Sequence, residues 1–248
     1  MPAEYVIPWK KIRAVCFDRG NVTHNCRLGP ATREKDRIAA LALAQHLQHL
    51  TGQGSTPEAI QANLLTPWRA SFAQRRERGH ELPLEPFFIR AFPELKDKPN
   101  QLQELISILG ATLIQWDQPA PDLLPLLKTL KKADLQVGIV SNTILPDRVY
   151  LHKYQSDQLT SMIDHYLFSY SQGLRKPEPE ILIRACAQLG VSPQETVMIG
   201  DQEEVDLRCA REAGVYAVLY RPENTNKAHP NQADLIIQSF AELEACLT

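Results

Sequence analysis

The sequence predicts an α/β protein in which a parallel β-sheet core is interrupted, after its first strand, by an all-helical insert. Two observations lead to this prediction. Short, continuous apolar runs alternate with helix-like patterns over the C-terminal half of the chain, which is typical of buried parallel strands and their crossover helices. Residues 25–119, in contrast, show helical periodicity and no clear strand pattern.

The apolar runs place the strands of the core. The first run ends at Asp18, and the crossovers between the later runs are expected to be right-handed. Predicted strands are Ile12–Phe17, Gln136–Val140, Tyr166–Phe168, Thr196–Ile199, Tyr216–Tyr220 and Leu235–Ile237. Predicted core helices are Pro121–Lys132, Pro179–Leu189, Glu204–Ala213 and Phe240–Leu247. Two of these helices are followed by Gly190 and Gly214, and glycine often ends a helix.

The insert is predicted to be a helical bundle. Its expected helices are Thr32–Leu50, Pro57–Arg78, Pro86–Ala91 and Asn100–Trp116. Apolar residues at helical spacing in the last helix are expected to form the bundle core, and they are Leu102, Leu105, Ile106, Leu109, Leu113 and Trp116. We therefore predict a core domain of residues 1–23 and 120–248, and a helical domain of residues 24–119.

Composition narrows the classes of function. The chain has 248 residues, 44% hydrophobic and 23% charged, which is ordinary for a folded soluble protein. A net charge of -2 disfavours a nucleic-acid-binding protein. No apolar run reaches the roughly 20 residues that cross a bilayer, and the N-terminus lacks a secretory signal pattern. Five scattered cysteines without a C-x-x-C pair disfavour a zinc or disulfide scaffold and favour the cytoplasm.

Polar residues follow several of the predicted strands. They are Asp18, Ser141, Lys176, Asp201 and Asp206. Each alone has an ordinary interpretation as a turn residue, a helix cap or a surface charge. Proteins with an open parallel sheet bind their ligands beyond the carboxyl ends of the strands. The occurrence of all these polar residues after strands, in this order, therefore favours a functional site.

The residue types indicate the chemistry. Carboxylates gathered at one sheet edge repel one another unless they are protonated or neutralised, and oxygen ligands of this kind suit Mg²⁺ bound together with a substrate phosphate. A carboxylate beside the ion can attack phosphorus and form an aspartyl-phosphate. A lysine and a serine nearby would hold the phosphoryl oxygens. The motifs G-x-G-x-x-G and G-x-x-x-x-G-K-[ST] are absent, so a dinucleotide or P-loop site is unsupported.

This constellation resembles the haloacid-dehalogenase-like hydrolase superfamily. The most specific piece is G-D-x-x-x-x-D, which begins at Gly200 and is followed by A-R-E-A-G-V. The resemblance implies a Rossmann-like core, with the helical insert as a mobile cap over the active site. It also implies a nucleophile and metal ligand at Asp18, a metal-binding backbone carbonyl at Gly20 and a second ligand at Asp201. Asp206 would support the metal.

The resemblance also implies a phosphoryl-binding pair, Ser141 and Lys176, which with Asp18 form the predicted catalytic set. Asn142 and Arg19 are the further candidates for substrate binding. The sequence offers two interpretations of Arg19, since the side chain could contact substrate or form a salt bridge at the cap boundary.

The first motif departs from the family pattern. Phosphatases of this superfamily usually read D-x-D-G-T, and their second Asp is the general acid and base, whereas this chain has Gly20 there. General acid–base assistance is worth roughly 10²–10⁴-fold in rate. Candidate replacements are His24, His80 and Glu81. Members resembling glucose-1-phosphate phosphatases carry a similar D-x-G-N-V motif, and a sugar-1-phosphate has a better leaving group than an alkyl phosphate.

Three hypotheses follow. The leading one is a Mg²⁺-dependent phosphatase that acts on a small phosphorylated metabolite through an aspartyl-phosphate. The second keeps the fold but cleaves a carbon–halogen or carbon–phosphorus bond; the latter would require a Schiff-base lysine in the cap, for which Lys35, Lys96 and Lys98 are available. The third is a non-catalytic descendant that binds a phosphorylated ligand or a protein partner. The sequence leaves the substrate and the oligomeric state open.

Overall fold

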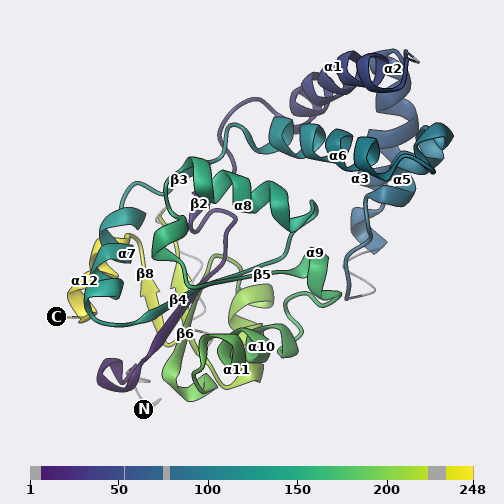
Figure 1. The fold of residues 1–248 in the computed structure, drawn as a ribbon. Helices are drawn as coiled ribbons and strands as arrows, with labels where there is room; N and C mark the ends of the chain where they lie inside the picture. The colour runs from purple at the N-terminus through teal and green to yellow at the C-terminus, as the bar shows by residue number, and fades with distance from the viewer. Residues whose placement is uncertain (1–6, 53, 75–78, 223–232, 248) are drawn as a thin grey trace.

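The core is a six-stranded, wholly parallel β-sheet (Figure 1). The computed structural model describes residues 7–52, 54–74, 79–222 and 233–247. The strand order is β5-β4-β1-β6-β7-β8. The strands are β1 (Ala14–Phe17), β4 (Gln136–Ser141), β5 (His165–Phe168), β6 (Thr196–Gly200), β7 (Tyr216–Tyr220) and β8 (Leu235–Ile237). Every predicted strand corresponds to one of these, and the predicted α/β fold class is confirmed.

Both faces of the sheet are buried, which explains the continuous apolar runs. In β1, Val15 and Phe17 join one apolar cluster, while Ala14 and Cys16 join another on the opposite face. The first cluster includes α7 (Leu123–Lys132) and α12 (Phe240–Leu247), and the second includes α10 (Glu180–Leu189) and α11 (Arg208–Ala213). The shorter helical elements of this part are η1 (Trp9–Lys11), η4 (Thr160–Met162), α9 (Ser169–Gln172), η5 (Pro193–Glu195) and η6 (Glu203–Leu207).

The insert is helical and lies at one end of the molecule, away from the sheet (Figure 1). The long helices α1 and α6 pack against each other. The helical segments are α1 (Thr32–Thr51), α2 (Pro57–Ile60), η2 (Gln61–Leu65), α3 (Thr66–Ala70), α5 (Glu85–Ala91), η3 (Pro93–Leu95) and α6 (Pro99–Ile114). The helix predicted over 57–78 is observed to residue 70 as three consecutive helical segments and is helical again at 72–74, and residues 75–78 lie outside the described residues.

The apolar stripe predicted on the last helix of the insert is confirmed for five of its six residues, which are buried. Trp116 is the exception, because α6 ends at Ile114 and the indole is only half-buried.

Besides several helical elements of three or four residues, the sequence analysis missed a short ribbon and a ten-residue helix. A short antiparallel ribbon pairs β2 (His24–Asn25) with β3 (Gln118–Pro119), so the prediction that 25–119 contains no strand was wrong at its two ends. Strands of two residues are too short to produce an apolar run. Helix α8 (Asp147–Ser156) was also missed, because it buries few side chains and its periodicity is weak.

The ribbon β2–β3 lies where the chain passes from the sheet to the insert and back again. The domain boundaries at 23/24 and 119/120 stay a prediction. Among the described residues, no helix combines the length and apolarity needed to span a bilayer.

Candidate active site

A cavity of about 440 Å³ lies at the carboxyl ends of the central strands. Asp18 follows β1, Ser141 ends β4, and Lys176 lies in the loop that follows β5 and α9. The cavity is lined by Asp18, Gly20, Asn21, Gly79, Ser141, Asn142, Arg175, Lys176, Pro177, Gln202, Val205 and Asp206. Of the predicted site residues, all but Asp201 and Arg19 line it.

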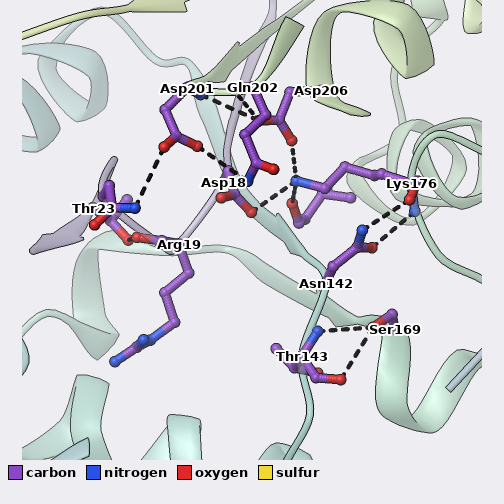
Figure 2. A network of polar contacts seen from close by, with 12 residues as sticks. Asp18, Arg19, Thr23, Asn142, Thr143, Ser169, Lys176, Asp201, Gln202 and Asp206 are labelled. Atoms are coloured by element: carbon purple, nitrogen blue, oxygen red, sulfur yellow. Dashed lines mark hydrogen bonds and ion pairs between the residues drawn. The ribbon is translucent and has the colours of Figure 1, made fainter. Parts of the chain in front are cut away.

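Lys176 is the buried cation of the site, with 1% of its side chain exposed. Its Nζ donates to Asp18 Oδ1 at 2.7 Å and to the Val140 carbonyl at 2.8 Å, and it forms an ion pair with Asp206 Oδ1 at 2.6 Å (Figure 2). Burial lowers the pKa of Lys176, but the two carboxylates outweigh it and hold the pKa above its ordinary value. The ammonium is therefore charged at neutral pH.

Asn142 fixes the backbone of the lysine loop. Its Nδ2 donates to the Lys176 carbonyl at 2.8 Å, and its Oδ1 accepts from the Lys176 N–H at 2.8 Å (Figure 2). Ser141 is buried at the end of β4, beside Asn142 in the cavity wall. The predicted phosphoryl-binding residues, Ser141 and Lys176, thus both line the cavity.

Asp18, Asp201 and Asp206 form an acidic cluster in which one carboxylate oxygen of each residue lies within 4.8 Å of those of the other two. Asp206 Oδ2 accepts from the N–H groups of Asp201 and Gln202 at 3.1 and 3.0 Å. The pKa of Asp206 is raised to about 6 by burial and by Asp18, against the effect of Lys176. Burial and the Asp18 charge also raise the pKa of Asp201. Three carboxylates beside a single ammonium provide the hard oxygen ligands that a divalent cation prefers.

The loop after β1 completes this cluster. Asn21 adopts a left-handed conformation with φ 57°, which Asn tolerates better than most residues. Its Nδ2 donates to Asp201 Oδ2 at 3.4 Å. Gly20 lines the cavity beside Asp18 and presents no side chain there.

Arg19 does not reach the cavity and forms the salt bridge that the sequence analysis left as an alternative. Its guanidinium donates to Asp117 Oδ2 at 2.9 Å. Figure 2 shows the side chain leading away from Asp18. The predicted role of Arg19 in substrate binding is therefore not supported by its position.

The candidate replacements for the missing general acid and base do not line the cavity. His24 is fully buried, with Nε2 3.0 Å from Asp157 Oδ2 and Nδ1 3.2 Å from Thr23 Oγ1. His80 is exposed. Glu81 is buried and forms an ion pair with Arg175 at 3.5 Å. None of these three lines the cavity formed by the described residues, and neither do the lysines proposed for Schiff-base chemistry, Lys35, Lys96 and Lys98.

Because His24 is buried, we expect the free energy of unfolding to fall at acid pH. Burial and the nearby Arg19 charge lower its pKa to about 3, against the effect of Asp157. The unfolded chain, with a histidine pKa near 6.5, therefore binds the extra proton below that pH, and stability is lost as the pH falls. Between pH 6.5 and 5 we expect a loss of about 2 kcal/mol from this one group. Urea unfolding at several pH values measures it.

The matched variants are His24→Asn and His152→Asn, since His152 is exposed on α8. The first should flatten the dependence of unfolding free energy on pH between 6.5 and 5, and the second should keep it. An unchanged slope in His24→Asn would show that another group is responsible.

Several cavity residues were not chosen as site residues from the sequence. Asn21, Arg175 and Gln202 each line the cavity and directly precede or follow a predicted site residue in the sequence. The sequence signal that could have found these residues is their position inside the motif segments around Asp18, Lys176 and Asp201. A sequence motif does not show, however, which way a side chain in a loop points.

Comparisons with known proteins identify the family of the chain. The model of the haloacid dehalogenase-like hydrolases matches residues 12–214. Ribulose-1,5-bisphosphate 5-phosphatase of Halopiger xanaduensis is 27% identical over 241 residues, covering 93% of this chain and 97% of that protein. Glyceraldehyde 3-phosphate phosphatase of Methanopyrus kandleri is 30% identical over 142 residues, covering 55% of this chain. The aligned part spans only 58% of that relative.

Solved structures share the fold. A HAD phosphatase from Thermococcus onnurineus aligns with a TM-score of 0.64 and 24% identity, over 95% of this chain and 98% of that one. A 2-haloacid dehalogenase from Pseudomonas syringae aligns with a TM-score of 0.68 and 18% identity, over 95% and 98%. The fold, the residues at the ends of the strands and the match to the family model thus define a hydrolase with a Rossmann-like core. The chain belongs to the haloacid dehalogenase-like hydrolase family.

Proposed function

We propose that the protein is a Mg²⁺-dependent phosphatase that acts on a small phosphorylated metabolite through an aspartyl-phosphate on Asp18. The observation that carries the proposal is the placement of Asp18 at the cavity, in contact with Lys176 and clustered with Asp201 and Asp206. Relatives named as phosphatases of ribulose bisphosphate, glyceraldehyde 3-phosphate and phosphoserine support a phosphate ester as the substrate.

The acidic cluster fits a magnesium ion. Asp18, Asp201 and the carbonyl of Gly20 would hold the ion, and Asp206 would support it. When bound, the ion would neutralise the carboxylates and the phosphate oxygens. Burial and the charge of Asp18 raise the pKa values of Asp201 and Asp206, as expected for carboxylates gathered in one buried cluster.

Residues of this chain carry out the steps of the proposed reaction. A carboxylate oxygen of Asp18 bonds to phosphorus as the bond from phosphorus to the alcohol oxygen breaks. Lys176 and Ser141 hold the phosphoryl oxygens during this transfer. The alcohol oxygen leaves with the bonding electrons and takes a proton from a water molecule, which becomes hydroxide, because Gly20 supplies no proton. A second water then attacks phosphorus and gives a proton to this hydroxide, the bond from Asp18 to phosphorus breaks, inorganic phosphate is released and the Asp18 carboxylate is restored.

Removing the metal tests the proposal. We expect phosphate release from a panel of phosphorylated metabolites to need Mg²⁺, to stop on addition of EDTA and to return with excess Mg²⁺, because the clustered carboxylates would otherwise repel the substrate. Colorimetric phosphate detection measures this. Turnover that persists at full rate in EDTA would contradict the metal requirement, and a panel without any turnover would contradict the phosphatase.

A further inference from the structure

Arg19 is a buried cation that the proposed chemistry does not use. Its guanidinium donates to Asp117 Oδ2 at 2.9 Å and to Cys26 Sγ at 3.4 Å, and lies 4.9 Å from the centroid of the Tyr150 ring in α8. The side chains of Arg19 and Asp117 are each 5% exposed. Because a buried charge is costly without its partner, each of these two side chains restrains the other.

The pair joins two segments that are 98 residues apart in the sequence. Arg19 follows Asp18 directly, and its carbonyl accepts from the N–H of His24 at 2.9 Å, where β2 begins. Asp117 lies between the end of α6 and the start of β3, the partner strand of β2. The ion pair therefore ties the loop of Asp18 to the point where the chain returns from the helical insert.

On the cavity side, two residues of this loop are held by their side chains, since Asp18 accepts from Lys176 and Asn21 donates to Asp201. Gly20 has no side chain, and glycine loses more conformational freedom on ordering than any other residue. The anchor on the far side of the backbone is Arg19, whose side chain points away from Asp18 (Figure 2). An anchor at this position limits rotation of the peptide groups on both sides of residue 19, which include the Asp18 backbone and the Gly20 N–H.

We propose that Arg19 is a positioning residue: its ion pair with Asp117 holds Asp18 and the Gly20 carbonyl in the arrangement that the metal and the phosphoryl group require. The inference rests on the proposed function. It assigns no contact with substrate to Arg19, and it makes the site dependent on a residue at the end of the insert.

The test compares two Arg–Asp ion pairs, of which Arg19–Asp117 is buried and Arg69–Asp36 is partly buried. Arg69 in α3 pairs with Asp36 in α1 at 2.6 Å, entirely within the insert. Both Arg19→Met and Arg69→Met should lower the unfolding temperature, since each leaves a carboxylate without its partner. Only Arg19→Met should weaken Mg²⁺ binding and reduce kcat, by about tenfold or more, with KM changed less than about threefold. Calorimetric titration with Mg²⁺ gives a readout that is independent of turnover.

A double variant separates positioning from stability. Arg19→Met with Asp117→Leu removes both buried charges, so its unfolding temperature should return toward that of the wild type while Mg²⁺ binding and kcat stay reduced. Recovery of Mg²⁺ binding and kcat together with stability would overturn the inference, as would equal Mg²⁺ affinity in Arg19→Met and Arg69→Met. A wild-type protein that binds no Mg²⁺ and releases no phosphate would instead overturn the proposed function itself.

Discussion

Replacing Asp18 with Asn is expected to reduce phosphate release by more than about 10³-fold, because the substitution removes the attacking carboxylate oxygen. The fold should survive, since an Asn carbonyl can still accept from Lys176 and the change lessens the repulsion with Asp201 and Asp206. Steady-state phosphate release and circular dichroism of the same preparation measure the two effects.

Asp201→Asn is the comparison variant, because Asp201 belongs to the same cluster but is not the proposed nucleophile. It should raise the Mg²⁺ concentration needed for half-maximal activity, with activity restored at high Mg²⁺. If Asp18→Asn behaved in the same way and recovered at high Mg²⁺, Asp18 would be a metal ligand only.

Gly20→Asp is expected to increase the hydrolysis of alkyl phosphates by roughly 10²-fold or more, the lower range of general acid–base assistance. There is room for the new side chain at its base, since a Cβ added at Gly20 meets only Asp18 Oδ2, at 3.8 Å. The acid would protonate the alcohol as it leaves. Hydrolysis of p-nitrophenyl phosphate should change little, because nitrophenolate leaves without a proton.

Gly20→Asn is the control, since Asn has nearly the shape of Asp and no proton to give. The ratio of rates on glycerol 3-phosphate and p-nitrophenyl phosphate is the measurement, and it should rise in the Asp variant alone. An equal rise on both substrates, or the same rise with Asn, would mean that Gly20 limits the reaction for a reason other than proton transfer.

The sheet and its strand-end residues could be predicted because local sequence encodes them directly. β1 is buried on both faces, so its residues form one apolar run, and the first polar residue after it, Asp18, marks its carboxyl end. The same reasoning placed Ser141 at the end of β4 and Asp201 after β6. Parallel pairing then brings residues more than 100 positions apart to one edge.

Other features depend on contacts that no local pattern contains. Arg19 follows Asp18 yet points the opposite way, toward a partner 98 residues further on, so its two interpretations could not be separated from sequence. Asp117 itself looks like any polar residue after a helix. The close fit at the end of β6 is different, because Gly200 and Asp206, whose Cβ would lie 2.2 Å from a Cβ added at Gly200, both belong to the local motif G-D-x-x-x-x-D.

Chemical trapping of the phosphorylated carboxylate tests the central claim most directly. Protein quenched during turnover and reduced with borohydride should carry homoserine at position 18, identified by peptide mass spectrometry, and only when both substrate and Mg²⁺ were present. Turnover that leaves residue 18 as unmodified aspartate, or a trapped adduct on any other residue, would contradict the role of Asp18 as the nucleophile.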